Sequence, residues 1–102
     1  MSYDLDLCID GSNDHSYNIT YNVSPMFYHH NREGIKGLNG LSGSEGALFL
    51  QGMINHFMNY SEELEAMNPA NGWGSYDNTL QCLIKMFTAS KNNPNAQWYV
   101  YN

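Results

Sequence analysis

Residues 3–9 read Tyr3-Asp4-Leu5-Asp6-Leu7-Cys8-Ile9, an alternation of large apolar side chains with polar or small ones. A period of two is typical of a β-strand with one buried side and one wet side. The alternation returns in residues 17–23, after the turn-forming run Gly11-Ser12-Asn13-Asp14. The short connection predicts an antiparallel hairpin with one face open to water.

Helix signals occupy the middle of the chain. Ser24-Pro25 predicts a short helix that extends to about Arg32, because Ser is a good N-cap and Pro suits the first helical position. The glycine-containing stretch 34–41 is expected to be a loop. Ser42-Gly43-Ser44-Glu45 matches a capping box, and the helix after it places Ala47, Leu50, Ile54 and Phe57 on one stripe. A short helix is then expected in residues 61–67.

Ser75 is the expected N-cap of a last helix, which would bury Leu80, Leu83, Ile84 and Phe87 and end near Ser90. Gln97–Tyr101 is predicted to be a terminal strand from its aromatic and β-branched content. The order is ββααααβ. We predict a single α+β domain over residues 1–102, with helices on one face of a small antiparallel sheet and the last strand beside the first.

The formal net charge is −6, and the four basic residues, Arg32, Lys36, Lys85 and Lys91, form no cluster in the sequence. Binding to a phosphate backbone needs a concentrated basic face, so we expect no direct contact with nucleic acid. No apolar run approaches membrane-spanning length and no signal peptide is recognisable, which favours a cytoplasmic protein without membrane contact. Cys8 and Cys82 are expected to be buried and reduced.

Neither a catalytic motif nor a metal motif stands out. The histidines are His15, His29, His30 and His56, without HExxH or CxxC spacing. On a helix the adjacent His29 and His30 would point about 100° apart and would not chelate one ion. We therefore expect no catalytic residue, metal or cofactor, although a zinc site assembled in space stays open as an alternative. The aspartates at positions 4, 6 and 10 are expected to share the wet face of the first strand.

The most distinctive segment is Asn68-Pro69-Ala70-Asn71-Gly72-Trp73-Gly74-Ser75-Tyr76, between two predicted helices. It offers hydrogen-bonding side chains, an aromatic plate and a helix N-terminus, which suits a nucleotide-like ligand or a partner protein. The other interpretation is that Trp73 fills the core while the rest shapes a tight connection. The candidate binding residues are Asn68, Asn71, Trp73, Ser75 and Tyr76.

Three segments together resemble a family of small, uncharacterised proteins carried by bacteriophages and prophages. They are residues 17–26 (Tyr-Asn-Ile-Thr-Tyr-Asn-Val-Ser-Pro-Met), residues 37–43 (Gly-Leu-Asn-Gly-Leu-Ser-Gly) and the segment around Asn71-Gly72-Trp73-Gly74. The family has no assigned activity. The resemblance implies a phage context, in which small acidic proteins often counter host defences.

We therefore expect a non-catalytic phage accessory protein in the host cytoplasm, which binds a host protein or a nucleotide-like signal. One alternative is a small enzyme acting on a nucleotide through His29, His30 or the aspartates. Another is an assembly role in a virion, with the terminal strand pairing between subunits. Whether the chain forms a homo-oligomer is left open.

Overall fold

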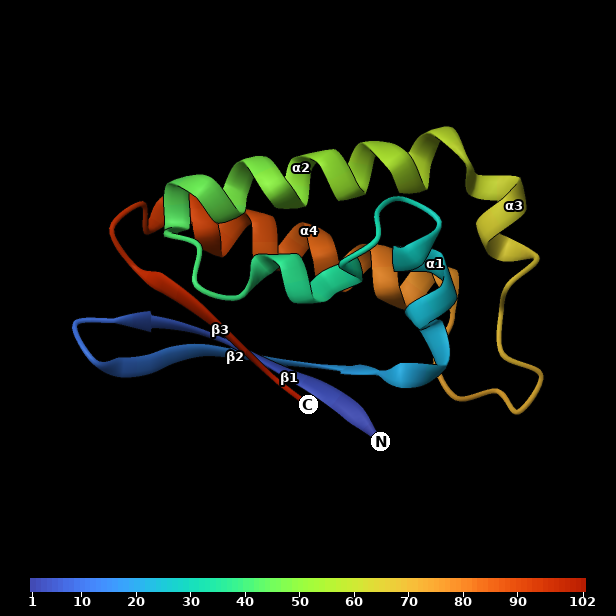
Figure 1. Cartoon of the computed structure of the whole chain (residues 1–102), viewed down its shortest axis with the longest axis horizontal. Helices are drawn as coiled ribbons and strands as arrows, with labels where there is room; N and C mark the ends of the chain where they lie inside the picture. The colour runs from blue at the N-terminus through green and yellow to red at the C-terminus, as the bar shows by residue number, and fades with distance from the viewer.

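The computed structural model describes residues 1–102, except for the side chains of residues 13 and 14. Three strands form one antiparallel sheet in the order β2-β1-β3, so the predicted α+β class and the place of the last strand beside the first are confirmed. The elements in Figure 1 are β1 (Ser2–Ile9), β2 (Ser12–Thr20), the 3-10 turn η1 (Tyr21–Val23), α1 (Ser24–Tyr28), the 3-10 turn η2 (Gly34–Leu38), α2 (Gly43–Asn59), α3 (Ser61–Glu65), α4 (Tyr76–Asn92) and β3 (Gln97–Tyr101).

The hairpin between β1 and β2 is tighter than we predicted. Asp10 and Gly11 form a two-residue connection, with φ angles of 51° and 84°, and Ile9 pairs with Ser12. An Asp-Gly pair suits this kind of turn, because both central residues need positive φ. The predicted four-residue turn was therefore wrong, β2 starts earlier than expected, and Asp10 lies in the turn and not beside Asp4 and Asp6.

At its other end β2 stops at Thr20, before the predicted Val23. The Thr20 side chain accepts a hydrogen bond of 3.3 Å from the backbone N–H of Asn22 and caps the 3-10 turn η1. Side-chain acceptors of this kind offer the backbone an alternative to the sheet ladder. The chain thus leaves the sheet three residues early and leads directly into α1.

All the helices lie on one side of the sheet, and α2 lies farthest from it (Figure 1). The apolar side chains of β1, such as Leu5 and Leu7, face the helices and are fully buried, as is Trp98 of β3. Because side chains alternate along a strand, Asp4 and Asp6 point to the opposite, open face. The predicted division of the sheet into a packed side and a wet side is confirmed.

The two long helices begin where we predicted, but α4 buries a different face from the one that we predicted. Both hydrogen bonds of the capping box between Ser42 and Glu45 are present, at 2.9 and 3.1 Å. In α4, however, Met86 is fully buried whereas Ile84 is 44% exposed. The predicted stripe counted only apolar residues. The buried stripe is Tyr76, Thr79, Leu83, Met86, Ala89 and Ser90.

Polar residues can join this stripe because their hydroxyl groups find partners. Ser90 Oγ donates to the carbonyl oxygen of Gly43 at 2.5 Å and accepts from Trp98 Nε1 at 3.0 Å. A side chain at Gly46 would meet the Trp98 ring at 2.5 Å. Trp98 therefore locks β3 to both long helices, and a glycine in α2 makes room for it.

The outer edge of β3 is covered by the segment that precedes α2. Trp98 N–H donates to the carbonyl oxygen of Leu41, and Gly40 N–H donates to that of Trp98, both at 2.9 Å. The Val100 N–H donates to Asn39 Oδ1, also at 2.9 Å. Residues 39–42 thus take the place of a further strand, which protects an edge that would otherwise be free to pair.

Neither Cys8 nor Cys82 is in a disulfide, and each is half-buried, whereas we expected both to be buried. Burial raises the pKa of the Cys82 thiol, and the nearby charge of Lys85 only partly offsets this. A raised pKa keeps the thiol protonated and unreactive. None of the helices in the described chain is long and apolar enough to span a membrane.

Candidate functional site

The segment from Asn68 to Ser75 connects α3 to α4 and packs against the end of β2. Gly74 has φ of 85°, and a Cβ there would lie 2.6 Å from Thr20 Cγ2. Only glycine meets both conditions, because other residues rarely adopt this φ and no space is left for a side chain. The loop therefore packs closely against the sheet at Thr20.

Three of the five candidate residues use their side chains to hold the loop and the start of α4. Asn68 Oδ1 accepts from the Tyr76 N–H at 2.8 Å, and Asn71 Oδ1 accepts from the Trp73 N–H at 3.0 Å. Ser75 Oγ accepts at 3.1 Å from the N–H three residues further on, as predicted for the N-cap. These three acceptor atoms bond to backbone N–H groups of the loop and of α4, which gives the residues a positioning role.

Tyr76 belongs to the core. It is 5% exposed, its ring stacks on Phe57 at a centroid distance of 5.6 Å, and its hydroxyl donates to the Phe57 carbonyl oxygen at 2.6 Å. Burial raises the pKa of the Tyr76 hydroxyl, and the nearby carboxylates Glu65 and Asp77 raise it further. Tyr76 thereby ties the start of α4 to the end of α2.

Trp73 is the exception, because 71% of its surface is exposed. None of the ring contacts in the described part of the chain involves it. The interpretation that Trp73 fills the core was wrong, and Trp98, with no exposed surface, has that place. We considered two roles for the whole segment, a binding surface and a structural connection. Trp73 suits the first role, and its neighbours have the second.

The N-terminus of α4 is poorly suited to an anion, contrary to one of our expectations. The backbone N–H groups of Tyr76 and Asn78 already bond to side chains of the loop. Asp77 also places a carboxylate in the first turn. A bound anion needs free N–H groups and gains nothing from a neighbouring negative charge.

A small hollow lies beside Gly74, between β2 and α4. Its volume is about 90 Å³, and its lining includes Thr20, Asn78 and Cys82. Pockets that hold drug-sized ligands usually measure roughly 300–1,000 Å³. The hollow is too small to enclose a nucleotide, so the loop offers a projecting side chain and not a deep pocket.

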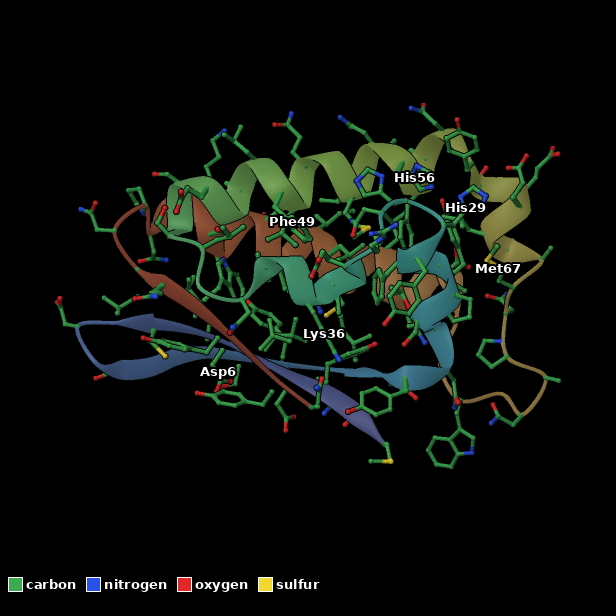
Figure 2. All side chains as sticks on the ribbon, viewed as in Figure 1. Asp6, His29, Lys36, Phe49, His56 and Met67 are labelled. Atoms are coloured by element: carbon green, nitrogen blue, oxygen red, sulfur yellow. The ribbon has the colours of Figure 1, made fainter. Side chains whose placement is uncertain are left out.

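A second feature, which the sequence did not suggest, is a cluster of three histidines, here called the histidine cluster: His29, His30 and His56. His29 Nδ1 and His56 Nε2 are 2.8 Å apart and share a hydrogen bond. The ring centroids of His30 and His56 are 4.6 Å apart, and Tyr60 lies 4.5 Å from His56. Figure 2 shows His29 and His56 close together beside α3.

The cluster forms because α1 ends against α2. The N–H groups of His29 and His30 donate to carbonyl oxygens of α1, to Pro25 and Phe27, which fixes their backbone. Gly52 and His56 lie one turn apart on α2. A Cβ at Gly52 would lie 3.9 Å from His30 Nε2, an ordinary van der Waals distance, so the His30 ring lies close to this turn of α2.

His56 is half-buried, whereas His29 and His30 are exposed. Burial lowers the pKa of His56, and the neighbouring His30 and His29 lower it further when they carry charge. The neutral form of His56 is thus favoured at neutral pH. We dismissed His29 and His30 as a pair, but each contacts a third histidine from another helix, which only tertiary structure could reveal.

The enzyme alternative would gain support if histidines and carboxylates converged beside Trp73 in one concave pocket. The histidines converge, but their aromatic neighbour is Tyr60. Asp4 lies on the open face of the sheet, on the side away from the helices. No group of three or more His, Cys, Asp or Glu side chains, among those that the structure describes, is placed to hold a metal ion.

Comparison of the chain with protein-family models, curated proteins and solved structures finds no match.

Proposed function

We propose that the protein is a non-catalytic binding protein that recognises a partner protein through Trp73. The supporting observation is a large aromatic side chain, 71% exposed, on a loop whose other side chains hold its backbone in place. Tryptophan is enriched among the residues that dominate protein–protein affinity. A residue held in position before binding loses less conformational entropy when the complex forms.

A protein partner has more support than a nucleotide-like ligand. The hollow beside the loop measures about 90 Å³, and the start of α4 has its N–H groups of Tyr76 and Asn78 occupied. A nucleotide needs an enclosing pocket for the base and free donors for its phosphates. A projecting indole suits a pocket on the surface of another protein.

The phage context belongs to this proposal through the resemblance of residues 17–26, 37–43 and 68–76. In that context the partner is a host protein, and the binding serves to counter a host defence. The net charge of −6 would speed association with a basic partner surface. An assembly role through β3 has less support, because residues 39–42 cover the edge that would have to pair.

The test is an affinity purification from bacterial lysate with the wild type, Trp73→Ala and Leu48→Ala. Leu48 is a matched control because it is apolar and 72% exposed, but lies on α2. The expected result is one protein retained by the wild type and L48A and lost with W73A, with no nucleotide detected by mass spectrometry. Equal retention by W73A would refute the role of Trp73, and a stoichiometric co-purified nucleotide would refute the choice of partner.

A further inference from the structure

We propose that His29 and His56 form a binding site for a divalent transition metal of the Ni²⁺ or Cu²⁺ type, where the end of α1 meets α2. The site is independent of Trp73 and of the proposed partner. It uses the two histidine nitrogens that already approach each other most closely.

The separation of these nitrogens fits a right-angled coordination geometry. Two nitrogen ligands that each lie about 2.0–2.1 Å from one metal ion, at a right angle, are about 2.9 Å apart. His29 Nδ1 and His56 Nε2 are 2.8 Å apart. A tetrahedral Zn²⁺ ion would need about 3.4 Å between its ligands. A right-angled site therefore needs the smaller change in the separation of the two nitrogens, which favours ions that accept square-planar or octahedral sites.

The metal would replace the shared hydrogen atom between the two rings. In the hydrogen bond, one nitrogen donates its hydrogen and the other accepts it. As metal ligands, both nitrogens must offer a lone pair, so the ring that donates the hydrogen changes to the tautomer that carries it on the other ring nitrogen. Each ring must also turn until its lone pair points at the ion. His29 is exposed, so its ring has more freedom to turn than that of the half-buried His56.

The neighbours of His56 limit its movement. His30 and Tyr60 have ring centroids 4.6 and 4.5 Å from that of His56, and Tyr60 also lies 5.4 Å from His29. These rings are positioning residues in the proposed site, because packing reduces the entropy that His56 loses when it binds metal. Water would occupy the remaining coordination positions.

The ligand type excludes hard cations from this proposal. Mg²⁺ and Ca²⁺ prefer oxygen ligands, chiefly carboxylates, whereas imidazole nitrogen suits Ni²⁺, Cu²⁺ and Zn²⁺. Among the described residues, the ring contacts of His29 and His56 include Tyr60 and His30. Mg²⁺ is therefore a suitable negative control.

The experiment is a calorimetric titration of tag-free protein with NiCl₂ and, separately, MgCl₂. The variants are His29→Ala and His56→Ala, with His15→Ala as the matched control. His15 lies on β2, apart from the histidine cluster, and its replacement removes one histidine without touching the site. Circular dichroism confirms the fold of each variant. Because His29 is exposed, H29A remains informative even if H56A does not fold.

We expect the wild type and H15A to bind one equivalent of Ni²⁺ with the same affinity and to show no heat with Mg²⁺. H29A should bind Ni²⁺ at least tenfold more weakly, since one of two ligands is lost. With Cu²⁺, electron paramagnetic resonance should show coupling to two nitrogens in the wild type and fewer in H29A. Unchanged Ni²⁺ affinity in H29A, or an equal loss in H15A, would overturn the proposal.

Discussion

Replacing Ser90 with alanine tests the contact that joins β3 to the two long helices. Ser90 Oγ bridges Trp98 Nε1 and the carbonyl oxygen of Gly43, and all three positions are buried. The substitution removes one oxygen atom and leaves the indole N–H without a partner inside the protein.

The cost can be worked out from these contacts. A buried donor left unsatisfied costs about 1–3 kcal/mol. The Gly43 carbonyl is at the start of α2 and retains its helical acceptor role. Alanine has a higher helix propensity than serine, by about 0.5 kcal/mol, which offsets part of the loss. We expect a net destabilisation of about 1–2 kcal/mol, which lowers Tm by roughly 4–16 °C in a domain of this size.

The assay is urea unfolding followed by circular dichroism, with Thr88→Ala as the matched control. Thr88 Oγ1 also donates to a helix carbonyl of α4, that of Ile84, at 3.0 Å, but it is exposed. Water can replace that bond, and T88A gains helix propensity as S90A does, so T88A should not lower the free energy of unfolding by more than about 0.5 kcal/mol. Equal effects of the two substitutions, or a wild-type midpoint in S90A, would refute the reasoning that burial makes the Ser90 bridge important.

Three further predictions concern α2 and the loop. Gly46→Ala places a Cβ 2.5 Å from the Trp98 ring. It should lower the free energy of unfolding in urea by about 1–2 kcal/mol through overpacking, net of the better helix propensity of alanine. Trp73→Ala should change the free energy of unfolding by less than about 0.5 kcal/mol, because the side chain is 71% exposed. A large loss of stability, measured by calorimetry, would show that Trp73 is part of the core. Hydrogen bonds from Ser42 lower the pKa of Glu45, so its contribution is present above the unfolded pKa and is lost as pH falls through the folded pKa. Glu45→Gln should therefore differ from the wild type at neutral pH and converge with it in acid, as measured by urea midpoints from pH 7 to pH 2.

Local patterns were sufficient where a few neighbouring residues decide the structure. The alternation in residues 3–9, the capping box at Ser42 and the N-cap at Ser75 each depend on residues within one or two turns, and each is confirmed. The predicted bounds of the hairpin were wrong because we placed the turn in the four residues 11–14. We overlooked Asp10-Gly11, a pair that forms the turn with two residues alone. That signal was present in the sequence.

The remaining differences come from tertiary contacts. The burial of Met86 in place of Ile84 follows from how α4 lies on α2, and periodicity could not tell the two apart. The candidate segment was identified as a unit, but the separation of Trp73 from its neighbours depends on which hydrogen bonds the folded loop makes. The meeting of His29 with His56 joins residues 27 positions apart.

Residues 39–42 also limit how the molecule could associate with itself. With the β3 edge occupied, further strands could join the sheet only at β2, its other end. Two copies joined there in antiparallel fashion would form a six-stranded sheet with a covered β3 edge at each end. Such a sheet stops growing at the dimer, because neither end offers a free ladder to a third chain. The segment thus prevents strand-by-strand polymerisation through β3.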